Sequence, residues 1–187
     1  MTWFSGVAAG DRTALAARLR QRDPELLELL IQQYEYRLYR YLMCLCGNPT
    51  LADDLFQETW MRVLDRGSQY RADASFEAWL FTIARHLVID FQRRKRWETL
   101  DDAAEEFTAA SAPSAFDEVA RRERESEVHG AMERLPAVQR EVLLLRFQED
   151  LPLDEIAAVV GAPLPTVKAR LYRALATLRG ELGGAHA

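Results

Sequence analysis

The chain has 187 residues, of which 49% are hydrophobic and 28% are charged, and its formal net charge is −5. These proportions are ordinary for a globular protein, and the length allows one well-formed core or two small ones. Residues 1–12 lack the basic start and the long apolar stretch of a secretory signal, and no apolar run is long enough to span a membrane. We therefore expect a cytoplasmic protein without membrane insertion.

The amino-terminal half predicts a series of helices, because apolar residues recur at helical spacing and no alternating strand pattern competes. A short helix of unassigned purpose is expected within 13–20. A first long helix is expected to start at Asp23-Pro24 and to stop at Gly47-Asn48-Pro49. A second helix is expected over about 50–65.

A third helix is predicted from Phe76 to Trp97, after a loop over 67–74, and it ends in four consecutive cations at 93–96. At 3.6 residues per turn its aromatic and aliphatic residues share one inward arc. The outward face carries Arg85, Ile89, Gln92, Arg93 and Arg96, with His86 beside them. Cations next to rings such as Tyr70 favour single-stranded DNA, whose unpaired bases stack on aromatic side chains. The alternative is that the aromatic residues are simply core.

The second helix has an outward face of a different kind, made of Asp54, Gln57, Glu58, Met61 and Asp65. Acidic and amide groups around an exposed Met favour a protein-docking surface over a DNA surface. A solvated acidic face without a partner is the alternative.

Composition changes after the third helix. Seven acidic residues and no basic one lie within 98–118, among small residues with little to bury, which predicts a linker or, alternatively, a featureless solvated tether. Helical spacing then resumes from about Asp117. We predict an all-α fold of two small helical domains joined by an acidic flexible linker. The parts are an extension (1–23), a first domain (24–97), the linker (98–118), a second domain (119–183) and a tail (184–187).

The second domain has the layout of a helix-turn-helix, which places a recognition helix in the major groove of DNA. The supporting helix is predicted over Leu153–Val160, the turn over Gly161–Pro165 and the recognition helix over Thr166–Arg179. No acidic residue interrupts the last segment before Glu181. Its outward side and flanks carry Thr166, Lys168, Ala169, Arg170, Tyr172 and Arg173. Arg and Lys there can reach guanine edges and phosphates, and Arg140 on the preceding helix is a candidate for phosphate contact. An ordinary amphipathic helix with a solvated basic face is the alternative.

Side chains suited to metal binding or catalysis are scattered. Cys44 and Cys46 lie two positions apart on a helix, point in different directions and are expected to be core residues. His86, His129 and His186 are far apart in the sequence. We therefore predict no metal, no cofactor and no catalytic residue.

Four stretches carry a resemblance to a known family: ADDLFQETWMRV, FEAWLFTIARHLVIDFQRR, LPAVQREVLLLRF and DEIAAVVGAPLPTVKARLYRAL. In this order and spacing they resemble a bacterial sigma factor of the sigma-70 family, of the extracytoplasmic-function (ECF) group that has only domains two and four. The resemblance covers about residues 24–97 and 130–182. It implies a factor that binds core RNA polymerase, recognises the −35 and −10 promoter elements, promotes DNA opening and is controlled by an anti-sigma protein.

The resemblance also implies roles for individual residues. Docking on the clamp helices of the polymerase β′ subunit falls to Asp54, Gln57, Glu58 and Met61. Contact with the −10 element, including capture of a flipped base, falls to Tyr70, Arg71, Ser75, Arg85, His86, Ile89, Asp90 and Arg93. Contact with the −35 element falls to Arg140, Thr166, Lys168, Ala169, Arg170, Tyr172 and Arg173. The β flap of the polymerase is a further implied partner, and the acidic linker resembles the segment that threads toward the polymerase active site.

Two positions depart from the family pattern. His86 stands where many relatives have Asn, so the −10 preference of this chain is not implied by the resemblance. Pro152 replaces the Ser or Thr that usually caps the supporting helix, and proline is tolerated at the start of a helix.

Two other classes of protein would also contain a helix-turn-helix. A DNA recombinase with an attached helix-turn-helix would need a nucleophile beside Arg or His groups, and no such cluster is present in the sequence. A two-domain transcriptional regulator that binds DNA unaided would explain the second domain equally well. It would not explain why an acidic face and a cationic helix occur together in the first domain.

Overall fold

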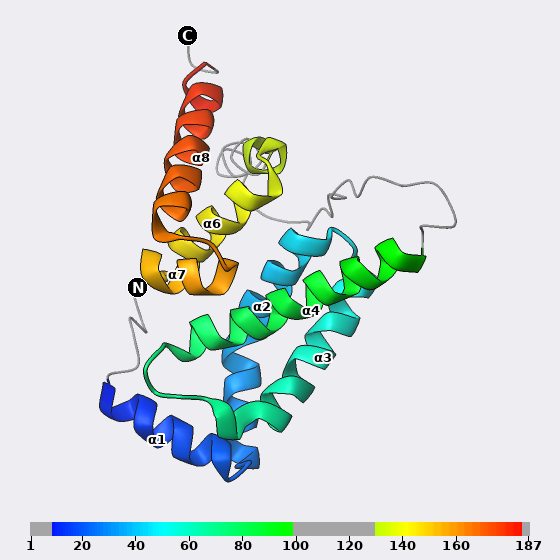
Figure 1. The fold of residues 1–187 in the computed structure, drawn as a ribbon, viewed down its shortest axis with the longest axis vertical. Coiled ribbons are helices and arrows are strands. Elements are labelled where there is room, and N and C mark those ends of the chain that lie inside the picture. Colours follow the sequence, from blue (N-terminus) through cyan, green and yellow to red (C-terminus); the bar gives the residue numbers. More distant parts are fainter. Residues whose placement is uncertain (1–8, 99–129, 185–187) are drawn as a thin grey trace, which may run out of the picture.

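The computed structural model describes residues 9–98 and 130–184, which form helices joined by short turns (Figure 1). The elements are α1 (Ala9–Arg20), α2 (Pro24–Cys46), α3 (Pro49–Arg66), the 3-10 turn η1 (Gly67–Gln69), α4 (Phe76–Glu98), α6 (Ala137–Phe147), α7 (Leu153–Val160) and α8 (Leu164–Gly184). No strand occurs in the two described ranges, so the prediction of helical domains is confirmed there. The predicted acidic linker lies, from residue 99 onward, outside the described residues. Within those ranges, no helix has the length and hydropathy needed to cross a bilayer.

The ends of the first helices are fixed by the capping residues that the sequence suggests. The Asp23 carboxylate accepts a hydrogen bond from the backbone N–H of Glu25 at 3.1 Å and so caps α2. Helix α2 ends at Gly47, whose φ of 60° is the left-handed conformation that glycine adopts without steric cost. The Asn48 side chain then accepts from the N–H of Leu51 at 3.0 Å and starts α3. Local signals are therefore sufficient to place these boundaries.

Helices α2, α3 and α4 pack against one another and form the bundle of the first domain. One end of this bundle holds a cluster of rings from α2, α4 and the loop between α3 and α4. The Tyr70 ring lies 5.9 Å from that of Phe76 and 5.3 Å from that of Trp79, and Tyr34 lies 5.3 Å from Phe76, between ring centroids. Large buried rings in tilted contacts contribute strongly to packing. The cluster therefore anchors the loop against the start of α4.

Helix α1 accounts for much of the stretch to which the sequence assigns no purpose. Ala16 and Leu19 are each 3% exposed, and the helix lies against η1 and the start of α2. The Arg18 guanidinium is 2.7 Å from the Asp23 carboxylate, and this hydrogen bond lowers the pKa of Asp23. Helix α1 is thus a structural part of the first domain and covers the η1 turn.

Helices α6, α7 and α8 form the second domain. A tight turn at Gly161, with φ of 59°, joins α7 to α8 as the helix-turn-helix layout predicts. Pro152 precedes α7 and provides no side-chain cap. Helix α8 begins at Leu164, earlier than predicted, because Pro165 is accommodated in its first turn. Val167, in the first turns of α8, is fully buried and is not among the residues predicted on the outward side.

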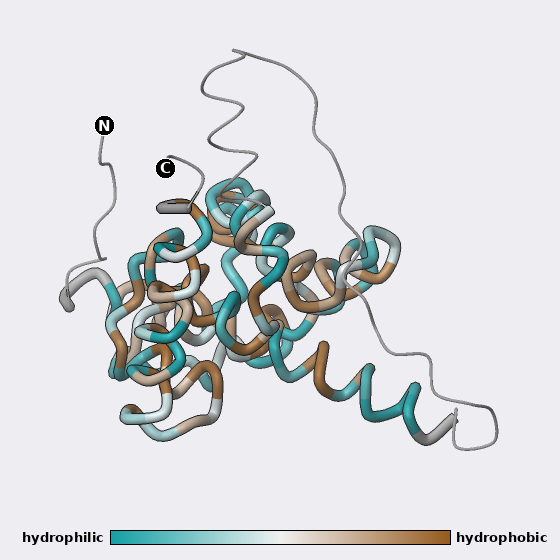
Figure 2. Tube along the Cα trace, turned by 90° about the horizontal axis from the view of Figure 1, so that it is seen from above, coloured by the Kyte–Doolittle hydropathy of each residue, from teal (hydrophilic) through white to brown (hydrophobic). Residues whose placement is uncertain are grey.

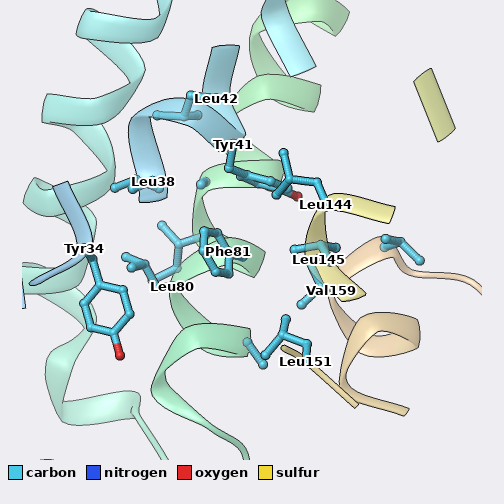
Figure 3. Packing of buried hydrophobic residues seen from close by; sticks show 14 of the residues in the cluster. Tyr34, Leu38, Tyr41, Leu42, Leu80, Phe81, Leu144, Leu145, Leu151 and Val159 are labelled. Atoms are coloured by element: carbon cyan, nitrogen blue, oxygen red, sulfur yellow. The ribbon is translucent and has the colours of Figure 1, made fainter. Parts of the chain in front are cut away.

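The two domains pack directly on each other. Helix α6 lies against α2, and α7 lies against α4, which is visible in Figure 1 as the yellow and orange helices over the blue and green ones. Their buried apolar side chains form one continuous cluster. Figure 3 shows Leu144 of α6 beside Tyr41 of α2, with Leu145 and Val159 on the side of Phe81 of α4. The helical pattern of the sequence does not predict this contact.

Gly67 is the point at which η1 meets α1, and a side chain there has no room. A Cβ at Gly67 would lie 2.9 Å from the backbone oxygen of Leu19. We predict that Gly67→Ala lowers the free energy of unfolding by about 1–3 kcal/mol, the usual cost of overpacking. Denaturant unfolding would measure it, with Gly180→Ala as control, because an added Cβ in α8 meets nothing within 4 Å. Unchanged stability of Gly67→Ala would contradict the contact.

Candidate protein and nucleic-acid interfaces

The outward face of α3 brings the predicted docking residues together. Asp54 and Gln57 are exposed, and Met61 is 55% exposed. Glu58 is half-buried, and its carboxylate lies 2.8 Å from Nε of Arg62, one turn further along. A solvent-accessible ion pair of this kind contributes little to stability. The four predicted residues therefore line one solvent-facing surface on which acidic and amide groups surround an apolar side chain.

The second half of α4 carries an exposed cationic surface. His86 is exposed, Ile89 is 39% exposed, and residues 92–96 are all exposed. Figure 2 shows this hydrophilic end of the helix projecting away from the bundle. Nη2 of Arg93 lies 3.1 Å from the carboxylate of Asp90, so one acidic group offsets part of the positive charge. These side chains face solvent in this conformation.

Tyr70 occupies a different place from the one that the sequence suggests. Its ring is fully buried in the aromatic cluster, and its hydroxyl donates to the carbonyl oxygen of Ala74 at 3.0 Å. Burial raises the pKa of Tyr70 to about 12. The expectation of an accessible ring is wrong for this conformation, and stacking on a base, which stays a prediction, would require the loop to move. Arg71, the next residue, is exposed.

Ser75 lies at the junction between the domains. Its hydroxyl oxygen accepts from the backbone N–H of Ala78 at 3.1 Å, which caps α4. Its own N–H donates to Oε1 of Glu155 in α7 at 3.1 Å, and its hydroxyl donates to the other oxygen of that carboxylate. A carboxylate is favoured at this place because the amino end of a helix carries a partial positive charge. Ser75 is therefore occupied by the second domain.

Arg85 also points into the contact between the domains, and the prediction that it lies on the outward face is wrong for this conformation. Its Nε donates to Oε1 of Glu141 in α6 at 2.9 Å. The Tyr41 hydroxyl donates to the same oxygen, also at 2.9 Å, and Glu141 is only 3% exposed. Burial, followed by the nearby Glu141 charge, raises the pKa of Tyr41 well above its ordinary value.

A second buried carboxylate joins the domains nearby, and sequence reasoning missed it. Glu149 is 4% exposed and lies 2.6 Å from Nε of Arg37 and 3.5 Å from Nη2 of Arg40, both on α2. Sequence reasoning missed Glu141 as well. A signal for Glu141 existed, because this acidic residue opens the run EVLLL over 141–145, in which every residue is buried.

Helix α8, the predicted recognition helix, presents the predicted basic surface. Lys168 and Arg173 are exposed, and Tyr172 is 68% exposed. Thr166, Ala169 and Arg170 are half-buried between them. Cations and a ring on a solvent-facing helix after a tight turn suit the major groove, where phosphates and guanine edges are within reach.

Arg140 holds the start of α6 in place. Its Nη2 donates to the carbonyl oxygens of Glu133 and Leu135, at 2.9 and 3.2 Å. These bonds use one edge of the guanidinium, so a phosphate contact by Arg140, which stays a prediction, would share the group with the turn before α6.

Comparisons with known proteins identify a family for each of the two domains. Residues 30–98 match the family model described as sigma-70 region 2, and residues 125–178 match that described as sigma-70 region 4. The chain is 30% identical to RNA polymerase sigma factor SigV of Bacillus subtilis over 164 residues, which cover 87% of this chain and 95% of the relative. It is 35% identical to ECF RNA polymerase sigma factor EcfG of Rhodopseudomonas palustris over 146 residues, 78% of each chain.

Solved structures show the same fold. The sigma factor RpoE of Bartonella quintana, solved in complex with the anti-sigma factor NepR, gives a TM-score of 0.69 at 24% identity and covers 83% of this chain and 96% of its own. CnrH, solved in complex with the cytosolic domain of CnrY, gives a TM-score of 0.65 at 22% identity and covers 93% of this chain and 97% of its own.

The fold and the matches define a protein with regions 2 and 4 of a sigma factor. The chain belongs to the sigma-70 family of RNA polymerase sigma factors, in its ECF group. Sigma factors are non-catalytic initiation factors that act with RNA polymerase on promoter DNA, so the recombinase alternative is set aside.

The burial of Tyr70 predicts a loss of stability at alkaline pH. An unfolded tyrosine loses its proton near pH 10, whereas Tyr70 in the folded chain has a pKa of about 12. The stabilising contribution is therefore complete below about pH 10 and is lost as the pH rises through the folded pKa. We predict that Tyr70→Phe loses less unfolding free energy between about pH 9 and about pH 11 than the wild type. Guanidinium unfolding at both pH values measures the difference, and equal losses in the two proteins would contradict the prediction.

Proposed function

We propose that this sigma factor attaches to core RNA polymerase through the outward face of α3, reads the −10 element with α4 and its preceding loop, and reads the −35 element with α8. The observation that carries the proposal is the solvent-facing side of α8, where Lys168, Tyr172 and Arg173 are exposed after the Gly161 turn. The division of roles follows the predicted domains, 24–97 and 119–183.

The docking surface consists of Asp54, Gln57, Glu58 and Met61, and its partner is the pair of clamp helices in the β′ subunit. The proposal is supported by the exposure of Asp54, Gln57 and Met61 on one face of α3. An apolar side chain surrounded by polar groups is the usual anatomy of a small protein interface. The β flap is the proposed second contact, and it would be made by the second domain.

The −10 surface has one accessible part and one covered part. His86, Ile89, Asp90 and Arg93 are open to solvent at least in part on α4, with Arg71 in the loop before it. Tyr70, Ser75 and Arg85 would join them only after the packing around them changes. We propose that the accessible part tracks the DNA backbone first, because sequence-independent binding is driven by cations that release counterions.

The net charge of −5 supports dependence on the polymerase. A negative overall charge opposes non-specific binding to DNA, whereas the local cationic faces of α4 and α8 still favour it at short range. The chain would therefore acquire useful promoter affinity only after docking, in the cytoplasm where the polymerase acts.

An anti-sigma protein is the proposed inhibitor. RpoE and CnrH, which share the fold of this chain, were each solved with a bound partner, named as the anti-sigma factor NepR for RpoE. We propose that this chain is held inactive by a partner of the same class.

Run-off transcription with core polymerase tests the proposed function, and it also separates a sigma factor from a regulator that binds DNA unaided. We predict that wild type initiates, and that Asp54→Arg with Gln57→Ala lowers affinity for core polymerase at least tenfold, about 1.4 kcal/mol. Glu35→Arg on the exposed side of α2 is the control for reversed charge. Unchanged core binding by the double variant would reject the α3 assignment.

Arg170 gives a test of the −35 assignment. We predict that Arg170→Ala relaxes the preference at one −35 base pair and costs about 1–3 kcal/mol there, as loss of a bidentate contact to guanine would. Binding of the chain in complex with core polymerase to a library of −35 variants measures the preference. Arg179→Ala, near the end of the same helix, is the control. An equal loss across all variants would instead identify a phosphate contact.

A further inference from the structure

We propose that the chain has a closed, autoinhibited form, in which three carboxylates of the second domain, Glu141, Glu149 and Glu155, hold the first-domain surface that must open to promoter DNA. The inference rests on the proposed function, because it concerns how the −10 surface becomes available. The inference is based on interdomain hydrogen bonds in which residues predicted to bind DNA act as donors.

Two of those predicted side chains are occupied in the closed form. Glu155 accepts from the N–H and the hydroxyl of Ser75, and Glu141 accepts from Nε of Arg85 at 2.9 Å. Carboxylate and phosphate oxygens bind the same donors, since both are anionic acceptors for Arg and for N–H groups at a helix start. The second domain therefore competes directly with a DNA backbone for Ser75 and Arg85.

The third carboxylate, that of Glu149, binds the first domain through α2. Glu149 is 4% exposed, so its charge must be matched within the protein, and Arg37 at 2.6 Å provides the hydrogen bond. The match is incomplete, because Oε1 of Glu149 faces Nη2 of Arg40 at 3.5 Å as an ion pair without a hydrogen bond, and Nε of Arg40 is buried without a hydrogen-bond partner among the described residues. A buried polar atom left unpaired costs free energy. This cost offsets part of the favourable energy of the interdomain contact.

Promoter geometry requires that opening. Elements centred near −35 and −10 are roughly 25 base pairs apart, or about 85 Å along the duplex at 3.4 Å per base pair. Domains in direct contact cannot reach both elements at once. Roughly 30 residues separate the two described ranges, and a chain of that length spans at most about 100 Å, so separation of the domains is physically possible.

The closed form blocks the two DNA surfaces unequally. The α8 face remains open, with Tyr172 68% exposed, whereas Ser75 is 9% exposed beneath α7. The loop that carries Tyr70 ends at Ser75, so the same contact holds this loop against the aromatic cluster. Autoinhibition by this device therefore acts on −10 recognition and melting before it acts on −35 binding.

The test compares the full-length wild type with Glu141→Gln/Glu149→Gln/Glu155→Gln. We expect the triple variant to show a larger radius of gyration in X-ray scattering and faster hydrogen exchange at the Ser75 amide. We also expect roughly tenfold tighter binding to fluorescent oligo-dT, because the apparent affinity of the −10 surface scales with the fraction of the open form. The matched control is Glu28→Gln/Glu35→Gln/Glu181→Gln, which removes the same charge from residues outside the interdomain contact and should behave as wild type.

A second variant guards against misfolding. Arg37→Gln removes the partner of Glu149 from the other domain, and Arg37 belongs to none of the predicted binding surfaces. It should open the chain in the same direction while circular dichroism shows intact helices. If folded Arg37→Gln and the folded triple variant both keep the wild-type radius of gyration and Ser75 exchange rate, the closed form is rejected.

The outcomes also separate this inference from the proposed function. Wild type that initiates with core polymerase, together with variants that do not open, would reject autoinhibition alone. Variants that open as expected, together with no initiation by wild type or variants on any promoter library, would reject the proposed function and leave the closed form standing.

Discussion

The arrangement of the two domains depends on the need to match buried negative charge. Glu141 is almost fully buried, and a carboxylate in that position is costly unless donors surround it. Its donors, Tyr41 and Arg85, come from α2 and α4, so the second domain cannot slide along the first without removing them. Apolar packing alone, such as that of Leu144 beside Tyr41, tolerates small shifts more readily. The charged contacts therefore fix the orientation, while the apolar cluster provides most of the attraction.

Because those donors include side chains with predicted roles in promoter binding, folding and function compete for the same groups. Arg85 donates to Glu141 in this structure, and its proposed contact with DNA would need the same guanidinium group. The acidic total charge works in the same direction, since it weakens DNA binding by the free chain. In the proposed mechanism, two independent physical effects oppose DNA binding by the free chain, one through the charge on the whole chain and one through local contacts.

Local signals made much of the fold predictable from sequence. The caps at Asp23 and Asn48 and the glycine turns at Gly47 and Gly161 act within a few residues, so the helix boundaries could be predicted closely. The α3 and α8 surfaces were also predictable in composition, because a solvent-facing side of a helix needs no packing partner to be recognised. The residue roles on these surfaces, in contrast, came from the family resemblance.

Contacts between distant segments could not be predicted in the same way. Helical spacing identifies an apolar face but not what covers it, and α4 has a second buried face with Phe81, Ala84 and Val88. Phe81 and Val88 lie seven positions apart, a helical spacing that indicates a second apolar face but not what covers it. Tyr70 was misplaced for a related reason, because a loop position suggests exposure unless the rings that surround it are known.

The packing of α1 against η1 determines where an amino-terminal fragment of this sigma factor can begin. The region 2 match begins at residue 30, inside α2, whereas Leu19 packs against Gly67 from well before that point. A fragment trimmed to the match would lose a whole helix and the first turns of another, and it would uncover the underside of the turn that leads to Tyr70. An amino-terminal fragment that keeps this contact must therefore include Ala16 and Leu19, the buried residues of α1, and shorter pieces would remove the support beneath the loop that carries Tyr70.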